Sequence, residues 1–477
     1  MVDHASLGFK AGLEIHQQIG SYKLFCRCPT LNSDAKQDVS FKRRLRAVAG
    51  ESGDIDIAAK HEMEKGKEFW YVGDSDDTCL VEYDESPPNP IINKEALNTA
   101  LQVSLLLNAK IVDEIQVMRK TVVDGSNVSG FQRTSLIAYD GHFETSKGIV
   151  KIPTICIEEE ACQKLENTDH YVKYKLDRLG IPLIEIATDA TLKDGEHAKE
   201  AAAYIGMVLR SVSGVKRGLG TIRQDVNVSI AKGARTEIKG FQDLKSIPKV
   251  IENEIGRQQA EIKKGKKLEK EVRKAEPDFT TSFLRPMPGA ARLYPETDVL
   301  PFAVDASLVA QIKKNLPKLL DEQIGELAKK YSLSKELAKE ALENDHFQKL
   351  VSTFKKIEPS VIAAAIITTP KEIKTRLKLD PGALSYHDFE QTLSYLEEGK
   401  ISKEAIIDIL AKKIKKEKID LSEFESASED DVEAEIKKII REKPGLNQGA
   451  YMGLVMQKFR GKIEGKKIME LLKKLVP

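Results

Sequence analysis

The chain has few cysteines, no long apolar run and almost no net charge. Its 477 residues include only five cysteines, an odd number that argues against a disulfide framework and for a reducing compartment. No stretch approaches the roughly 18 consecutive apolar residues of a membrane-spanning helix, and the first residues, MVDHASLGFK, lack the pattern of a secretory signal. A cytoplasmic location is therefore expected. The net charge is only +1, so any contact with nucleic acid must be local.

Motifs of several enzyme classes are also missing. The sequence has no G-x-x-x-x-G-K-[ST] phosphate loop and no G-x-S-x-G nucleophile motif. The segment RGLGTIRQD contains Gly218 and Gly220 but not the dinucleotide-binding fingerprint. No amidase nucleophile with its base is recognisable. If the chain transfers phosphoryl groups, it must do so with Mg²⁺ on carboxylates and with arginine and lysine side chains from loops.

The spacing of apolar residues changes near residue 300. Before it, short runs rich in Ile, Val and Thr, such as GLEIH, IVKIPTICIEE and IPLIEIAT, predict strands. Three amphipathic helices are predicted among them, at 94–108 with Asn93 as N-cap, at 196–212 after Asp194, and at 246–266. After residue 300, apolar residues recur at spacings of three and four, which predicts helices. The pattern indicates an α+β protein with a sheet domain at 1–300, a helical domain at 301–398 and a helical tail domain at 399–477.

Two of the predicted strands carry ionisable side chains that are candidates for metal binding or catalysis. Glu185 lies between Ile184 and Ile186, and a carboxylate half-buried in this way needs a cation, a hydrogen-bond donor or a metal. An acid that faces outward from a half-exposed strand fits the pattern equally well. Glu14 and His16 are two residues apart, so in a strand they project from the same face. His16 alone would more often be a structural histidine, but its pairing with Glu14 favours a ligand.

The same alternation recurs on further strands. In the run IEEE, Glu159 should face opposite to its two neighbours, Glu158 and Glu160. Two pairs of polar residues two apart follow later in the chain: Asp225 with Asn227, and Glu237 with Lys239. Oxygen ligands with few nitrogens suit Mg²⁺ bound together with substrate phosphates. The strands therefore predict a site for a hard divalent cation.

Three of the cysteines are candidate ligands for a second metal site. Cys26 and Cys28 form C-x-C in LFCRCPT, and Cys79 follows in DDTCLVEYD. A zinc site would need a fourth ligand at a recognisable spacing, and no C-x-x-C partner is present. Reduced, partly buried thiols are the simpler interpretation.

The C-terminal segment is locally basic. Lys458, Arg460 and Lys462 surround Gly461 in KFRGK, between two predicted helices. Such a cluster is typical of a modest phosphate-binding patch. From charge alone, the ordinary surface of a soluble helix is an equally good interpretation.

Taken in order, the motifs of the first 300 residues resemble one family. They are GLEIHQQI, KLFCRCPT, IEEEA, LDRLGIPLIEIAT, RGLGTIRQDVNVSI, TEIKGFQDL and RPMPGAARLYPETD. The chain resembles the B/E subunit family of glutamyl-tRNA(Gln) amidotransferases, and the archaeal E subunit more than the B subunit. The E subunit normally carries an inserted domain, similar to one in bacterial aspartyl-tRNA synthetases, before the last of these motifs. Here only KKGKKLEKEVRKAEPDFTTSF lies there, which puts any tRNA-discriminating role of the insertion in doubt.

The resemblance implies a cradle-shaped domain around a sheet, with the active site in its concave face. It implies one set of residues that hold the divalent ions and carry the chemistry: Glu14, His16, Glu159, Glu185 and Asp225. It implies a second set that contacts the nucleotide or the acyl end: Arg119, Lys120, Ser126 and Gln132. The basic residues Lys458, Arg460 and Lys462 of the tail would bind tRNA.

The implied reaction uses ATP and Mg²⁺. The side chain of Glu-tRNA(Gln) is phosphorylated and then amidated to give Gln-tRNA(Gln). Ammonia is expected from an asparaginase-like partner, the D subunit of the amidotransferase, in a heterotetramer with two copies of each chain. Two alternatives remain at this stage. One is a non-catalytic tRNA-binding scaffold, and the other is a B-type subunit with an amidase-signature partner.

Overall fold

A large mixed β-sheet forms the centre of the first of two units, Met1–Leu320 and Asp321–Pro477, into which the computed structural model divides. The structure describes residues 3–30, 36–47, 49, 53–241, 243–287, 289, 293–424, 429–459 and 465–475. The strands of the large sheet lie in the order β15-β14-β13-β12-β1-β11-β8-β7-β6-β16, and β4 also pairs with β7. Among these described strands, only β13 and β14 run parallel. An α+β fold with a sheet domain followed by a helical region is thus confirmed.

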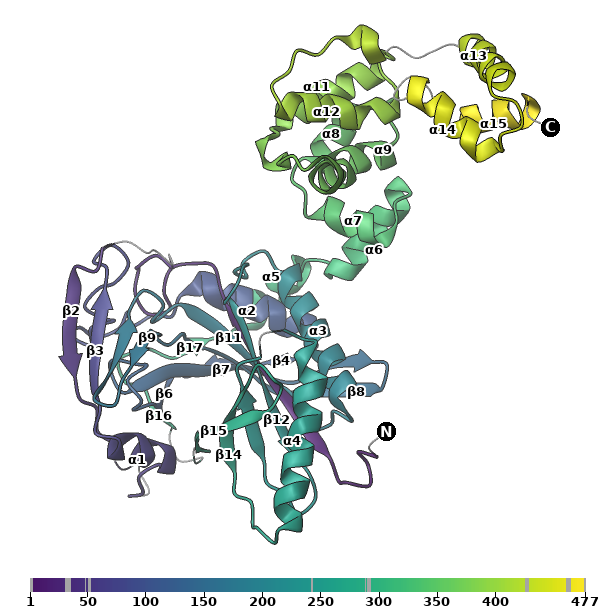
Figure 1. Ribbon diagram of the computed structural model, residues 1–477. Helices are drawn as coiled ribbons and strands as arrows, with labels where there is room; N and C mark the ends of the chain where they lie inside the picture. The colour runs from purple at the N-terminus through teal and green to yellow at the C-terminus, as the bar shows by residue number, and fades with distance from the viewer. Residues whose placement is uncertain are drawn as a thin grey trace. The chain divides into compact units, whose positions relative to one another are not determined.

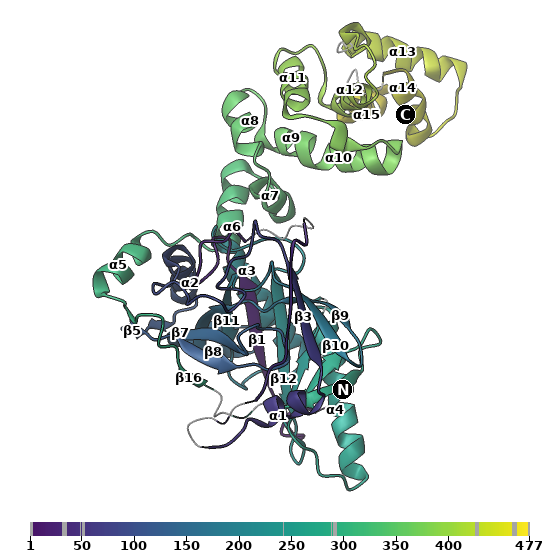
Figure 2. The same ribbon diagram turned by 90° about the vertical axis from the view of Figure 1, so that its left-hand side faces the viewer.

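The bounds of these strands, in chain order, are β1 Lys10–Gln18, β4 Lys110–Ile111, β6 Met118–Thr121, β7 Phe131–Thr145, β8 Gly148–Glu159, β11 Pro182–Ala187, β12 Ile222–Ser229, β13 Thr236–Lys239, β14 Glu271–Ala275, β15 Thr281–Pro286 and β16 Leu293–Pro295. A second sheet has the order β2-β3-β10-β9, and Figure 2 shows β3, β10 and β9 side by side. Its strands are β2 Val39–Arg43, β3 Glu68–Gly73, β9 Gln163–Asn167 and β10 Tyr171–Lys175. A third, two-stranded sheet pairs β5 Glu114–Ile115 with β17 Phe302–Ala303.

Three helices pack on one face of the large sheet (Figure 1). They are α2 Lys94–Leu106, α3 Gly195–Ser211 and α4 Ser246–Lys263, which confirms all three predicted helices. The side chains of Asn93 and Asp194 accept hydrogen bonds from the first-turn N–H groups of α2 and α3, as N-caps do. At the start of α3, Gly195 is required by close packing, because a Cβ there would lie 2.6 Å from the Cα of Pro248 in α4.

The main hydrophobic core lies between these helices and the sheet. Leu13 and Ile15 of β1 and Ile184 and Ile186 of β11 belong to it, and all four are almost completely buried. Because successive side chains of a strand point to opposite faces, the residues between them point away from the helices. The burial of one face by α2, α3 and α4 therefore determines which side chains face the other side.

Two shorter helices complete the first unit. They are α1 Ile57–Glu64, which contacts β15, and α5 Ala306–Lys314, which packs against α2. The first turn of α1 is capped by Asp56, whose side chain accepts hydrogen bonds from the N–H groups of Ala58 and Ala59.

The regular elements among the described residues of the second unit are all helical. Its elements are α6 Leu320–Tyr331, α7 Lys335–Leu342, α8 Phe347–Thr353, α9 Pro359–Ala363, η1 Ala364–Thr368, α10 Thr369–Glu372, η2 Ile373–Leu377, η3 Pro381–Ala383, α11 Tyr386–Glu397, η4 Lys403–Ala405, α12 Ile406–Ile414, η5 Leu421–Phe424, α13 Glu429–Glu442, α14 Gln448–Phe459 and α15 Gly465–Leu475. Helices α13, α14 and α15 share a small apolar core around Val455 and Leu472. Across the described parts of the chain, every helix is too short or too polar to cross a bilayer.

Candidate functional site

The register of three neighbouring strands brings the predicted ligands together. On β1, His16 lies directly opposite Glu185 of β11, and Glu14 lies directly opposite Asp225 of β12. Residues paired in this way across antiparallel strands have Cβ atoms about 5 Å apart on the same face. That face points away from α2, α3 and α4, because Leu13 and Ile15 point toward them.

The imidazole of His16 lies among three carboxylates. Its Nε2 atom is 3.4 Å from an oxygen of Glu14, 3.5 Å from Glu185 and 3.6 Å from Glu158. The side-chain ligand atoms of Glu14, His16 and Glu185 all lie within 4.8 Å of one another. One imidazole nitrogen and several carboxylate oxygens therefore converge from three strands on one point.

A second group of acids adjoins the first. The carboxylates of Glu14, Asp225 and Glu237 also lie within 4.8 Å of one another, so Glu14 belongs to both groups. The ammonium group of Lys239 donates to Asp225 at 2.5 Å and lies 2.5 Å from Glu237. Both groups have the oxygen-rich composition that Mg²⁺ and similar hard cations prefer, with a single nitrogen in one of them.

The charges of these side chains depend on one another. Burial and the nearby Glu185 raise the pKa of Glu14 to about 7. Burial opposes the charge of His16, but its hydrogen bond with Glu185 and the carboxylates around it outweigh burial and raise its pKa to about 9. Burial likewise opposes ionisation of Glu185, yet His16 and Lys120 hold its pKa below the usual range. The surplus of acids at Glu14 is the electrostatic situation that a divalent cation would relieve.

Most of these groups lie at the wall of a large cavity in the first unit, but Glu185 is not among the described residues that line that cavity. Its volume is about 1310 Å³, large enough for a nucleotide and the acyl end of a second substrate. The catalytic candidates Glu14, His16 and Asp225 line it, and so does a set of cationic side chains. That set is Lys65, Lys67, Lys120, Lys164, Arg178, Arg223, Arg235, Lys239, Lys270 and Arg285. A cavity with acids at one point and cations around it suits a polyanion bound through metal ions.

The structure does not bring Glu159 into the cluster. Its side chain is buried on the other face of β8, where Arg133 lies 3.3 Å from one oxygen and donates its backbone N–H to the other. The guanidinium of Arg133 also donates to Glu296 at 2.8 Å. Glu158 occupies the expected place instead, 3.6 Å from His16. The alternation of the strand causes the difference, since adjacent residues cannot share a face.

Of the four residues predicted to contact the nucleotide or the acyl end, three line the cavity and one is not among the described residues that line it. Lys120 lines the cavity and donates to Glu158 at 2.7 Å, and Gln132 and Ser126 line it as well. Arg119, the neighbour of Lys120 on β6, is not among the described residues that line the cavity. It donates to Glu296 at 2.6 Å and lies over the ring of Phe131.

Sequence reasoning did not select two residues that line the cavity, Glu158 and Arg223, whereas Glu237, which it singled out together with Lys239, lines the cavity as well. The alternation places Glu158 and Glu159 on opposite faces but does not show which of the two faces the cavity. Arg223 donates to Glu160 at 2.6 Å across two strands, a contact that only the strand order reveals.

Of the predicted tRNA-binding residues, Lys458 lies in α14 and donates to Glu435 of α13 at 2.5 Å. Arg460 and Lys462 lie outside the described residues.

Comparison with known proteins identifies relatives of the chain. The model of the GatB/GatE catalytic domain matches residues 9–310. The chain is 36% identical to the glutamyl-tRNA(Gln) amidotransferase E subunit of Methanocaldococcus jannaschii, and the alignment covers 99% of each chain. It is 34% identical to the E subunit of Archaeoglobus fulgidus, again over 99% of each chain. It is 35% identical to that of Methanosarcina barkeri, over 99% of this chain and 98% of the relative.

The length of these alignments bears on the missing insertion. The alignment with the Methanocaldococcus jannaschii protein spans 625 positions, whereas this chain has 477 residues. At least 148 of those positions therefore have no residue here. This total is large enough to account for a whole domain.

Proposed function

Because the chain belongs to the GatB/GatE family, we propose that its cavity phosphorylates the side chain of tRNA-bound glutamate and then admits ammonia to it. Similarity over the full length supports the function of the E subunit of a Glu-tRNA(Gln) amidotransferase, which is a catalytic ligase chain that uses ATP. The observation that carries the proposal is the convergence of Glu14, His16 and Glu185 within 4.8 Å of one another, with Glu14 and His16 at the wall of the cavity.

The residues fit Mg²⁺. Glu14, His16 and Glu185 would hold one ion, with Glu158 beside them, and Glu14, Asp225 and Glu237 would hold a second. When bound, the ions would neutralise phosphate charge and polarise the reacting oxygens. Glu158 takes the role that the family resemblance assigned to Glu159, because Glu158 alone of the two faces this cluster.

The chemistry then proceeds in two steps. An oxygen of the glutamate side chain attacks the γ-phosphorus of ATP, the bond to the β-phosphate oxygen breaks, and ADP leaves. Ammonia next attacks the acyl carbon of the γ-glutamyl phosphate, phosphate leaves, and the nitrogen loses a proton. The protein's part is mainly to position the two substrates and to balance charge. Lys120 and Lys239 already stand beside the carboxylates and would stabilise the phosphate oxygens.

The ammonia is proposed to come from an asparaginase-like D subunit in a heterotetramer with two copies of each chain. The relatives named above are all E subunits, which favours this partner over the amidase partner of a B-type subunit. The clustering of acids in a cavity argues against a non-catalytic scaffold.

An assay that bypasses the partner tests the proposal. The full chain, given charged Glu-tRNA(Gln), ATP, Mg²⁺ and ammonium chloride, should form Gln-tRNA(Gln) with about one ADP for each amide. Omission of ATP should abolish the product, because a carboxylate does not exchange its oxygen for nitrogen without activation. If Gln-tRNA fails to form although tRNA binds, the proposed catalytic role is excluded.

The tail is proposed to bind the tRNA body through Lys458, Arg460 and Lys462. Replacement of all three by glutamate should raise KM for tRNA by roughly tenfold, because phosphate contacts supply much of the affinity. The value of kcat should stay within about twofold, since the substitutions leave every residue of the cavity unchanged. The matched control replaces Lys415, Lys416 and Lys418 by glutamate, because these three lysines are exposed in the second unit. An equal rise of KM in the control would mean that total charge, and not this segment, determines binding.

A further inference from the structure

Within the described part of the chain, one arginine beside the acid groups around Glu14 donates a single hydrogen bond. Arg223 of β12 lies directly opposite His16 of β1, so its side chain projects from the face of the sheet that carries the acids. It lines the cavity, and its side chain is 44% exposed. Of the described residues, only Glu160 accepts a hydrogen bond from its guanidinium group, at 2.6 Å. A guanidinium group has five N–H donors, so the others are available to a ligand in the cavity.

Two other cations beside the acids are paired with those same acids. The ammonium group of Lys120 donates to Glu158 at 2.7 Å. That of Lys239 lies 2.5 Å from an oxygen of Asp225 and 2.5 Å from an oxygen of Glu237. Carboxylates of the site therefore balance the charge of both lysines, whereas the partner of Arg223 lies outside the two acid groups.

Two further arginines of the cavity wall direct their donors to other protein atoms. The guanidinium group of Arg178 donates to the main-chain oxygens of Ala161 and Cys162. That of Arg235 donates to the sulfur of Met287. Among these arginines, Arg223 alone has its side chain beside His16 and is held by a carboxylate at a single edge.

Glu160 is a fixed acceptor for Arg223. It is 1% exposed and follows directly after β8. One carboxylate oxygen accepts from the backbone N–H of Ala161 at 3.1 Å, and the other accepts from the side-chain amide of Gln18 at 3.2 Å. The backbone N–H of Glu160 donates to Ile181 O at 2.8 Å. A buried carboxylate held in this way fixes the plane of the guanidinium group and leaves its remaining N–H groups for a ligand.

We propose that Arg223 is a catalytic residue that binds the phosphoryl group during its transfer, and that Glu160 is the residue that positions it. This inference rests on the proposed function and adds a protein contact to the transferred group. During transfer, the bond from the γ-phosphorus to the β-phosphate oxygen breaks, and a bond from the phosphorus to the glutamate carboxylate oxygen forms. Arg223 keeps its proton throughout, and two of its N–H groups donate to oxygens of the phosphoryl group. Fixed donors of this kind stabilise the charge of the transition state.

The first test replaces Arg223 in the full chain. Arg223→Ala should lower kcat for tRNA-dependent ATP hydrolysis by about 100-fold. Arg223→Lys should restore little of the rate, because an ammonium group lacks the planar pair of donors. Added guanidinium ion at millimolar concentration should raise the rate of Arg223→Ala by about fivefold or more, because it supplies that pair of donors again. The matched control is Arg217→Ala, which removes an exposed arginine that precedes β12 and should keep the full rate.

The second test asks whether Glu160 acts through Arg223. Glu160→Gln alone should lower kcat by about 10-fold, because a neutral amide holds the guanidinium group less firmly. The double variant Glu160→Gln with Arg223→Ala should have the kcat of Arg223→Ala alone, since no guanidinium group remains to be positioned. If Glu160 were merely structural, the two losses would multiply. If Glu160→Gln does not fold, Arg223→Ala and its response to guanidinium ion still decide the role of Arg223.

Two results would overturn the proposal. One is a kcat of Arg223→Ala within about threefold of the unchanged chain. The other is a loss that guanidinium ion does not relieve and that multiplies with the loss in Glu160→Gln. The unchanged chain separates this inference from the proposed function. If that chain forms Gln-tRNA and Arg223→Ala forms it equally fast, only the assignment of Arg223 fails. If the unchanged chain forms none, the proposed function fails as well.

Discussion

Replacement of Glu158 by glutamine should lower the rate of Gln-tRNA formation by at least about 100-fold, with little change in stability. The carboxylate of Glu158 lies 3.6 Å from His16, a predicted metal ligand. It lies 2.7 Å from Lys120, which is proposed to stabilise the phosphate oxygens. Glutamine has the same shape but no charge, so it removes a ligand and leaves the packing intact. Lys120 would also lose the closer of its two carboxylate neighbours and keep Glu185, 3.7 Å away. The measurement is kcat in the ammonium assay, together with the unfolding midpoint of the variant.

The corresponding change at the next residue, Glu159→Gln, should lower stability and have little effect on the rate. Glu159→Gln should reduce stability by about 3 kcal/mol, because it leaves the buried guanidinium of Arg133 with one charged partner in place of two. Below its unfolding temperature, this variant should keep kcat within severalfold of the unchanged enzyme. An inactive Glu159→Gln variant of normal stability, beside an active Glu158→Gln variant, would show that the strand presents its other face to the substrates.

This pair of residues marks the limit of prediction from sequence. The alternation of IEEE shows that Glu159 faces opposite to Glu158, but not which of the two faces the cavity. That depends on the pairing of β8 with β11, in which Glu158 lies opposite Leu183 and Cys156 lies opposite Glu185. Pairing between distant segments is a property of the folded sheet, and a shift of one residue would exchange every side chain between the faces.

Local sequence signals were sufficient to predict three helices and one pair of site residues. The helices that begin at Lys94, Gly195 and Ser246 were predicted within a few residues, because their starts and their apolar faces are encoded over one or two turns. Glu14 and His16 were recognisable because a strand places residues two apart on one face.

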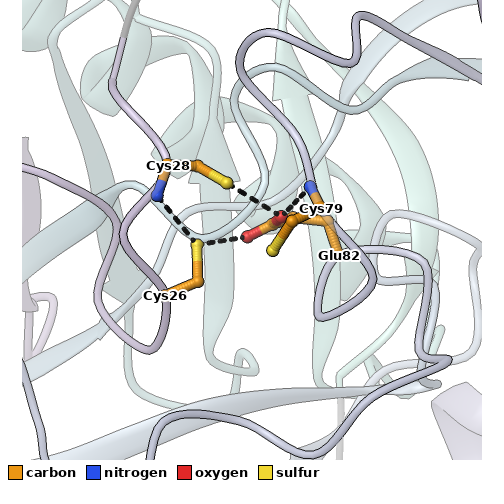
Figure 3. Close-up of side chains that lie close together, drawn as sticks. All are labelled: Cys26, Cys28, Cys79 and Glu82. Carbon is orange, nitrogen blue, oxygen red and sulfur yellow. Dashed lines mark hydrogen bonds between the residues drawn. The ribbon is translucent and has the colours of Figure 1, made fainter.

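Glu82 lies three residues after Cys79 but was not recognised as a neighbour of Cys26 and Cys28. Figure 3 shows the four side chains close together, and their sulfur and carboxylate oxygen atoms lie within 4.8 Å of one another. The loop of Glu82 follows that of Cys26 and Cys28 after about 50 residues of chain, and no spacing rule reaches across a connection of that length.

Replacement of Glu185 by glutamine should have the largest effect, a loss of about 1000-fold or more in both tRNA-dependent ATP hydrolysis and Gln-tRNA formation. Glu185 lies 3.5 Å from His16 and 3.7 Å from Lys120, and its two flanking isoleucines are completely buried in the core. Glutamine keeps these isoleucines and the strand in place, so the fold should survive. The negative charge that Glu185 contributes to the proposed divalent-cation site beside His16 would be lost. The matched control is Glu196→Gln on α3, an exposed acid that should leave both rates unchanged.

Direct measurement of metal binding tests the central claim, that acids and an imidazole from β1, β11 and β12 hold a divalent cation in the cavity. Mn²⁺ can replace Mg²⁺ and is observed by electron paramagnetic resonance. The full chain should bind Mn²⁺ with the nitrogen of one histidine in its coordination sphere, and Glu185→Gln should weaken binding at least about 10-fold while Glu196→Gln does not. Equal Mn²⁺ affinity in the unchanged chain and in Glu185→Gln, with no histidine nitrogen coupled to the ion, would contradict the account.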